Sequence, residues 1–366
     1  MSNAACVSGG KSSFVGDLPE EKPPQPADGV TERLNERLAR LGADMDEIER
    51  VKQVYPMKIS RHFLNLISEK NDPIWRQAVP NIEELCDVYN VSDPLSEERD
   101  TKVPGLVHRY PDRVLLMVSS RCAMYCRFCT RKRTVGKIVQ TPMEQIFQGI
   151  DYIRSHPEIR DVLLSGGDPL LRTDKDLDII LGELRSVPHV EIIRIGTRIP
   201  SVMPERITPK LVEVLKKYHP LYMNLHFEHP REINPESERA LKLLADAGIP
   251  LGSQSVLLRG VNDDPEVMKE LMQKLVKNRV RPYYIYLCDL VKGVEHFRTT
   301  LQCGFDVVHH LQGYTSGLCV PHLIIDSPGG GKIPVLPPDY LLSVGGESAT
   351  ISNYKGEVYE YPNPRV

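Results

Sequence analysis

The chain of 366 residues contains no apolar run near the ~18 residues that a membrane-spanning helix needs. Its first residues, MSNAACVSGGKSSF, lack the basic start and apolar core of a secretory signal. Neither sign of charge dominates, because 46 basic and 49 acidic residues give a formal net charge of −3. We therefore expect a cytoplasmic protein with no nucleic acid and no membrane among its partners.

The eight cysteines do not indicate a disulfide framework, which is typical of short secreted chains. The sequence also lacks the two separated cysteine pairs of most structural zinc sites. Three cysteines, Cys122, Cys126 and Cys129, stand close together with the spacing C-x3-C-x2-C, and the others are scattered. This pattern predicts one ligand cluster and otherwise ordinary thiols.

Composition and periodicity divide the chain into four segments. Residues 1–30 are rich in Gly, Pro, Ser and charge, which predicts a disordered tail. Residues 31–104 begin with leucines at helical spacing and predict a helical segment that wraps around the rest. Residues 105–318 alternate short apolar runs with charged helical stretches, and residues 319–366 form an irregular segment with short strands and a glycine-rich loop.

The alternation in residues 105–318 is typical of parallel βαβ units. The count of units favours an α/β fold, a partial (β/α)6 TIM-like barrel, over a closed barrel of eight units. Active sites of such folds lie at the carboxyl ends of the strands, so functional residues should follow strands directly. The predicted strands are Val114–Ser119, Val162–Ser165, Glu191–Gly196, Leu221–His226, Leu251–Val256 and Arg281–Tyr286.

The cysteine triplet comes directly after the first predicted strand. Three thiolates on a [4Fe–4S] cluster leave one iron without a protein ligand, and that iron can bind a small molecule. A chance cluster, or part of a zinc site, is the alternative. The tight spacing and the position at a strand end favour the iron–sulfur interpretation.

The stretch CAMYCRFCTRKR resembles the radical S-adenosylmethionine superfamily and, within it, the lysine 2,3-aminomutase family. The resemblance extends from about residue 70 to about residue 355. It implies an isomerase of the intramolecular aminotransferase type with a [4Fe–4S] cluster on Cys122, Cys126 and Cys129, S-adenosyl-L-methionine and pyridoxal 5′-phosphate. Further matching stretches are HRYPDRVLL, LLSGGDPLL, IRIGTR, NLHFEHP, GSQSVLLRGVND, YYIYLCDLVKGVEHFR and DSPGGGKIPV.

Residues at the ends of three strands are implied to bind S-adenosylmethionine. His226 and Gln254 end the fourth and fifth strands, although a lone histidine in a strand is more often a core residue. In the loop after the second strand, glycines allow a ligand to approach the backbone and an acid can accept an ammonium group. The alternative for this loop is a tight turn. Its residues are Ser165, Gly166, Gly167 and Asp168.

Lys332 follows the glycine-rich stretch DSPGGG. A lysine there could bind phosphate beside backbone amides, but Ile333 stands where a P-loop needs Ser or Thr. The resemblance implies that Lys332 holds pyridoxal phosphate as an imine, on a loop one glycine shorter than is usual in the family. It also implies that Arg109, Tyr110 and Arg113 contact the phosphate and ring of that cofactor, whereas a solvated loop is the alternative.

The remaining site residues concern the substrate. The resemblance implies that Arg131 binds the substrate carboxylate and that Tyr286 lies near the substrate. Asp289 and Asp326 would bind a cation at the far end of the substrate, which implies conversion of L-lysine to β-lysine (3,6-diaminohexanoate). Arginine, another cationic amino acid or a lysine within a protein would also suit two acids. A non-catalytic iron–sulfur or zinc-binding protein is the alternative of a different class.

The resemblance also implies partners. These are a small-molecule amino-acid substrate, an electron donor such as flavodoxin or ferredoxin, and further copies of the chain in a homo-oligomer. Longer members of the family bind zinc through cysteines near the C-terminus. No cysteine follows Cys319 in this chain, so we do not expect that zinc site here.

Overall fold

A computed structural model of the chain describes residues 28–366 except 88–89, 137–139, 338–339 and 363–366. Nearly all of the tail expected over residues 1–30 lies outside the described residues. None of the helices in the described part of the chain combines the length and the apolar character that a bilayer crossing requires.

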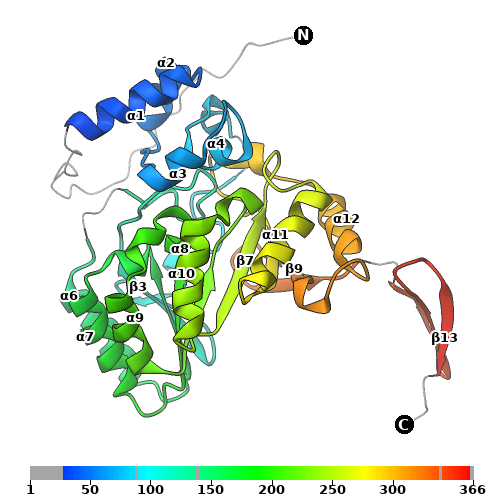
Figure 1. Cartoon of the computed structure of the whole chain (residues 1–366). Coiled ribbons are helices and arrows are strands. Elements are labelled where there is room, and N and C mark those ends of the chain that lie inside the picture. The colour runs from blue at the N-terminus through cyan, green and yellow to red at the C-terminus, as the bar shows by residue number, and fades with distance from the viewer. Residues whose placement is uncertain (1–27, 88–89, 137–139, 338–339, 363–366) are drawn as a thin grey trace.

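A curved ten-stranded sheet forms the centre of the molecule, and its strands follow one another in chain order from β1 to β10 (Figure 1). Strands β3 to β9 run parallel. At the edges, β1 (Thr101–Val103), β2 (Leu106–Tyr110) and β10 (Lys332–Val335) are antiparallel to their neighbours. The parallel strands are β3 (Arg113–Ser119), β4 (Asp161–Gly166), β5 (Ile192–Thr197), β6 (Leu221–Leu225), β7 (Leu251–Leu257), β8 (Val280–Leu287) and β9 (His322–Asp326).

The predicted α/β fold, a partial barrel that does not close, is confirmed. The six predicted strands correspond to β3–β8, and within the described residues no pairing joins β1 to β10, so the sheet does not close into a barrel. The sheet is larger than the alternation indicated, because β9 pairs in parallel with β8 and β10 pairs with β9. The segment from residue 319 onward therefore contributes two strands to the same sheet.

Amphipathic helices connect the parallel strands and pack along the outside of the sheet (Figure 1). Most begin at a side chain that accepts a backbone N–H, such as Thr173 before α7 and Asn234 before α10, which satisfies donors that a helix start leaves unpaired. The connecting helices are α6 (Met143–Arg154), α7 (Asp174–Arg185), α9 (Pro209–Leu215), α10 (Pro235–Asp246), α11 (Pro265–Lys277) and α12 (Leu301–Leu311).

The segment before the sheet is made of helices, and one of them forms ion pairs with the cysteine loop. Glu84 is fully buried and forms ion pairs with Arg127 (2.5 Å) and Lys132 (2.6 Å), both within CAMYCRFCTRKR. These helices are α1 (Asp28–Arg40), α2 (Met45–Lys52), α3 (Arg61–Leu66), α4 (Pro73–Ala78), the 3-10 helix η1 (Ile82–Leu85) and α5 (Glu97–Asp100).

At the other end of the chain, β11 (Leu341–Val344), β12 (Ser348–Ser352) and β13 (Val358–Pro362) form a separate antiparallel sheet. Figure 1 shows this small sheet, in red, projecting from the body of the molecule. It lies apart from the carboxyl ends of β3–β9, where the candidate site is found.

Candidate active site

A cavity of about 470 Å³ opens at the carboxyl ends of the parallel strands. Every residue that the sequence predicted for the site lines this one cavity, although the residues come from distant parts of the chain. Most of these residues meet because the parallel strands deliver their carboxyl ends to the same edge of the sheet. The antiparallel strands β2 and β10 and the start of β3 supply the others. These residues are Arg109, Tyr110, Arg113, Cys122, Cys126, Cys129, Arg131, Ser165, Gly166, Gly167, Asp168, His226, Gln254, Tyr286, Asp289, Asp326 and Lys332.

The three predicted cluster ligands lie on the loop after β3. Burial, reinforced by the neighbouring thiols, raises the pKa of Cys122 and raises that of Cys129 to about 11. Thiolates at these positions therefore need the positive charge of bound metal atoms. Among the described residues, no group of His, Cys, Asp and Glu side chains is arranged to hold a single metal ion. A four-iron cube is larger than such a site and takes thiolate ligands, which these cysteines supply around one cavity.

The glycine loop after β4 is locked against the start of the cysteine loop. Gly166 has a φ of +119°, and a Cβ there would lie 2.1 Å from the Ser119 carbonyl oxygen. A Cβ on Gly167 would lie 2.3 Å from the Arg121 carbonyl oxygen. Only glycine allows this approach, so these two glycines have a packing role whatever ligand the loop binds.

Asp168 ends the glycine loop, and its carboxylate connects β4 to β5. It accepts hydrogen bonds from the Thr197 hydroxyl (2.8 Å), the Arg198 backbone N–H (2.8 Å) and the Leu170 backbone N–H (3.0 Å). Burial raises the pKa of Asp168 to about 6 although these bonds oppose the shift. The carboxylate thus orients the end of β5, and its contact with a cofactor ammonium group stays a prediction.

Polar side chains form a chain of hydrogen bonds across β6, β7 and β8. Gln254 bonds to the His226 ring (2.8 Å) and accepts from the hydroxyls of Tyr283 (2.8 Å) and Tyr286 (3.4 Å). Asn224 donates to the Tyr283 hydroxyl (2.6 Å). Asn224 and Tyr283 were not predicted from the sequence, but strand alternation could have indicated Asn224, which lies two residues before His226.

Lys332 begins β10, directly opposite Asp326 at the end of β9. Its ammonium group lies 3.1 Å from the Asp326 carboxylate and 4.5 Å from the centre of the Tyr286 ring. The Lys332 side chain is 37% exposed. A lysine that is accessible, paired with an acid and set beside an aromatic ring can bond covalently to a carbonyl compound.

Arg109, the first arginine of HRYPDR, lies beside the glycine-rich loop that precedes Lys332. A Cβ on Gly330, whose φ is +89°, would lie 2.2 Å from the Arg109 guanidinium carbon. Arg109 also pairs with Asp100 (2.7 Å), and the Arg113 guanidinium stacks over the Tyr110 ring at 3.9 Å. The missing side chain of Gly330 thus leaves room for the Arg109 guanidinium. Two arginines and a ring line this part of the cavity, a set that suits a phosphorylated aromatic cofactor.

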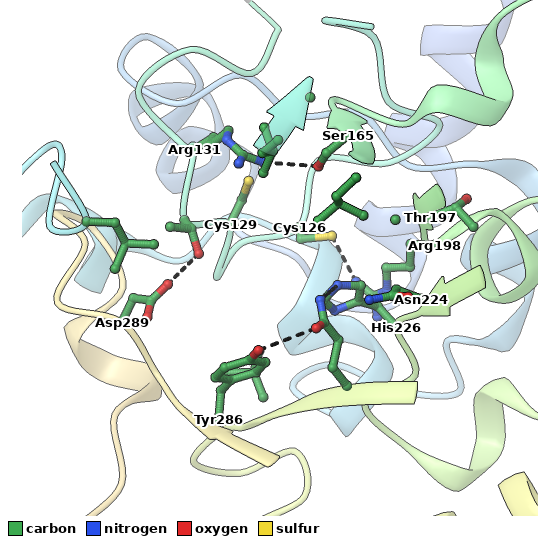
Figure 2. A pocket seen from close by; sticks show the side chains of 18 of the residues that line it. Cys126, Cys129, Arg131, Ser165, Thr197, Arg198, Asn224, His226, Tyr286 and Asp289 are labelled. Carbon is green, nitrogen blue, oxygen red and sulfur yellow. Dashed lines mark hydrogen bonds between the residues drawn. The ribbon is translucent and has the colours of Figure 1, made fainter. Parts of the chain in front are cut away.

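Arg131 points into the cavity and is held by an acid that the sequence analysis missed (Figure 2). Its guanidinium bonds twice to Glu97 on α5, at 2.6 and 3.0 Å, and its Nη1 donates to the Ser165 hydroxyl at 3.4 Å. Glu97 belongs to the charged run SEERD, which reads as an ordinary solvated surface. No signal in the sequence singled it out.

Asp289 faces the same cavity, and its carboxylate accepts a 2.5 Å hydrogen bond from the Thr130 hydroxyl (Figure 2). Burial, and to a lesser extent the nearby Asp326 carboxylate, raises the pKa of Asp289 to about 6. The charged form of an acid next to a second carboxylate is stabilised by a cation placed between the two. Thr130 was also missed, because its bond to Asp289 joins residues far apart in the sequence.

Comparisons with known proteins agree with this geometry. A family model described as "Radical SAM superfamily" matches residues 116–272, and one described as "Lysine-2,3-aminomutase" matches residues 308–366. L-lysine 2,3-aminomutase of Clostridium subterminale is 55% identical over 84% of this chain and 75% of its own length. The corresponding protein of Methanococcus maripaludis is 52% identical over 87% of this chain and 75% of its own length.

Glutamate 2,3-aminomutase of Clostridioides difficile is also similar, with 44% identity over 85% of this chain and 75% of its own length. The relatives therefore share most of their length with this chain but differ in the amino acid that they are named for. From these similarities, together with the cysteine loop and the cavity that it faces, we conclude that the chain belongs to the lysine 2,3-aminomutase family of the radical S-adenosylmethionine superfamily.

Proposed function

We propose that this enzyme converts L-lysine to β-lysine, with Asp289 and Asp326 as the residues that select the substrate. Family membership alone leaves the side chain of the substrate open, since one relative is named for glutamate. The observation that carries the proposal is the pair of neighbouring carboxylates on the cavity wall. They would repel the side chain of glutamate and attract the ammonium group of lysine.

As a member of this family, the chain is an isomerase that uses a [4Fe–4S] cluster, S-adenosylmethionine and pyridoxal phosphate. When bound, the reduced cluster and S-adenosylmethionine supply a 5′-deoxyadenosyl radical, and pyridoxal phosphate supplies the conjugated system through which the amino group migrates. The lining residues fit these groups: Cys122, Cys126 and Cys129 for iron, and Lys332 with Arg109 for a phosphorylated carbonyl compound.

Lys332 and Asp326 would act as an exchangeable ion pair. Before Lys332 can bond to a carbonyl carbon, its Nζ must give up a proton, and the Asp326 oxygen at 3.1 Å is placed to hold it. That proton then passes to solvent, and the ionised carboxylate is free to pair with the side-chain ammonium of the substrate. When the product leaves, Lys332 would bond to the cofactor again.

Arg131 would bind the substrate carboxylate at the opposite end of the same molecule. Glu97 holds the guanidinium through Nε and Nη2, which leaves Nη1 directed toward Ser165 and the cavity. An arginine fixed by one acid presents its remaining donors in a defined direction. The distance between Arg131 and the acid pair would then set the length of the amino acid that fits.

We also propose a small one-electron donor of the flavodoxin or ferredoxin type, a homo-oligomer and a cytoplasmic location. Arginine or another cationic amino acid is a second candidate substrate, supported by the same acid pair, which binds a guanidinium as well as an ammonium group.

A substrate panel tests the proposal. The reconstituted full chain is assayed without oxygen, with dithionite, S-adenosylmethionine and pyridoxal phosphate, on lysine, arginine and glutamate in turn. We expect β-lysine as the main product and no turnover of glutamate. A higher kcat/KM for arginine or glutamate than for lysine would overturn the assignment of substrate while leaving the family unchanged.

A further inference from the structure

Arg198 is a buried cation in contact with one cluster ligand, although the mechanism above gives it no role. It follows β5, and its Nη1 donates a 2.9 Å hydrogen bond to the Cys126 sulfur, drawn as a dashed line in Figure 2. Only 8% of Arg198 is exposed. A guanidinium stays charged at any pH in the working range, so this contact places a permanent positive charge beside a cluster ligand.

The position of Arg198 is fixed from several sides. Its Nη2 pairs with the fully buried Glu232 at 3.2 Å and donates to the Gln77 side-chain oxygen. The rings of Phe63 and Phe128 lie 5.4 and 5.2 Å from the guanidinium carbon. An arginine enclosed in this way cannot swing away to solvent, so the donor remains on the sulfur.

The ion pair with Glu232 does not by itself explain why Arg198 also contacts the Cys126 sulfur. Glu232 also accepts from the Ser201 hydroxyl (2.5 Å) and the Gln77 amide (3.0 Å). Arg127, the other buried arginine at the cysteine loop, has its guanidinium bonded to Glu84 and to backbone carbonyls. The two buried arginines therefore contact the cysteine loop in different ways. The Arg127 side chain anchors the loop to Glu84 and to backbone carbonyls, whereas Arg198 donates to the sulfur of a cluster ligand.

We propose that Arg198 is a positioning residue that raises the reduction potential of the cluster through a charged hydrogen bond to the sulfur of Cys126. A thiolate bound to iron keeps lone pairs that can accept this bond. Reduction adds one electron from an external one-electron donor, and no bond forms or breaks in that step. The added negative charge spreads onto the sulfurs, so a nearby positive donor stabilises the reduced form.

Glu232 supplies a matched test of opposite sign. Its carboxylate pairs with Nη2 of the guanidinium whose Nη1 bonds to the sulfur, and it partly cancels the charge of Arg198. Glu232→Gln keeps the shape of the side chain and removes that charge, so the potential should rise. Arg198→Met removes both the charge and the donor, so the potential should fall. Arg198→Lys keeps the charge without the planar fork and should lie between Met and the natural residue.

The experiment is a redox titration of the reconstituted full-length variants, followed by electron paramagnetic resonance, with iron and sulfide measured in each. Held at the midpoint potential of the unaltered protein, Arg198→Met should show a tenfold lower ratio of reduced to oxidised cluster, equivalent to about 59 mV for one electron. Arg206→Met is the control, because Arg206 pairs with Asp174 and backbone carbonyls rather than sulfur.

Equal potentials and equal spectra in Arg198→Met and the unaltered protein, at full iron content, would overturn the proposal. If Arg198→Met takes up no cluster, Glu232→Gln decides: a higher potential supports the proposal, and an unchanged or lower one overturns it. The titration needs no amino-acid substrate, so its outcome is independent of whether lysine is the substrate proposed above.

Discussion

The two ends of the cavity are built differently, although they serve one reaction. At the cysteine end, the charged side chains are buried and each makes several bonds: those of Glu84, Arg127 and Lys132 pair with one another and are each 6% exposed or less. At the lysine end, Lys332 is 37% exposed and holds one carboxylate. The cysteine end is therefore organised before ligands arrive, whereas the lysine end keeps an ion pair that a ligand can replace.

The largest effect should come from removing the exchangeable group. Lys332→Ala should abolish turnover, because no other lysine is seen at the described cavity wall to hold the carbonyl cofactor, while iron content stays unchanged. Product formation and iron content are measured on the same samples, with Lys355→Ala in the turn between β12 and β13 as the control. Normal β-lysine formation by Lys332→Ala would contradict the view that the lysine end supplies the group that binds the carbonyl cofactor.

A change at the rigid end should act on folding instead. Glu84→Gln leaves two buried cations without their carboxylate, which costs about 3–5 kcal/mol in the free energy of unfolding. Denaturant unfolding of the cluster-free protein measures this loss. Glu83→Gln, at the exposed neighbouring position, should change stability by less than about 0.5 kcal/mol. Equal stability of the two variants would show that the ion pairs of Glu84 do not stabilise the cysteine loop.

Substrate selection can be weakened by changing a residue outside both the buried Glu84 ion pairs and the Lys332–Asp326 pair. Asp289→Asn removes one charge that faces the substrate ammonium group, so KM for lysine should rise about 10- to 100-fold, as expected for a lost hydrogen bond to a charged group. Cluster content should not change. Steady-state kinetics measure the effect, with Asp306→Asn on the exposed face of α12 as the control. An unchanged KM would remove Asp289 from the substrate site.

The same residue predicts a pH dependence. The pKa of Asp289 is raised to about 6, so the carboxylate is charged above that pH and becomes protonated as the pH falls through it. KM for lysine should therefore increase between about pH 7 and pH 5. The increase should be smaller in Asp289→Asn, which has no carboxylate to protonate. A pH profile of KM that is identical in both proteins would contradict this assignment.

The smallest effect should come from the support of that acid. Thr130→Val removes the 2.5 Å hydrogen bond to Asp289, worth about 1 kcal/mol, and should raise KM for lysine roughly fivefold. The double variant with Asp289→Asn should show no additional loss, because the bond is already changed. Additive losses would mean that Thr130 acts on something other than Asp289.

Much of this architecture could be predicted from the sequence, because its signals are local. Alternating strands and helices identified β3–β8, and motifs placed directly after strands brought their residues to one edge of the sheet. The parallel strand β9 was read only as a short strand, since its five residues follow a long connection that contains α12. The hairpin DSPGGGK could have predicted that Asp326 and Lys332 meet, because it is short enough to pair them.

The parts that the sequence did not reveal are pairwise contacts between distant segments. Glu97 lies 34 positions from Arg131, and Thr130 lies 159 positions from Asp289. Arg198 stands in the motif IRIGTR, but nothing in that motif indicates a contact with Cys126, 72 positions away. Periodicity reports which face of an element a residue occupies, whereas only the packed structure determines what lies opposite.

The central claim is that the cysteine loop and Lys332 act together on one lysine molecule in one cavity. The most direct test is anaerobic turnover of L-lysine that carries ¹⁵N only on its α-amino group, with the product analysed by nuclear magnetic resonance. The account predicts β-lysine with ¹⁵N bonded to C3, formed only when cluster, S-adenosylmethionine and pyridoxal phosphate are all present. Full cluster and cofactor loading with ¹⁵N remaining on C2 of unconverted lysine would contradict it.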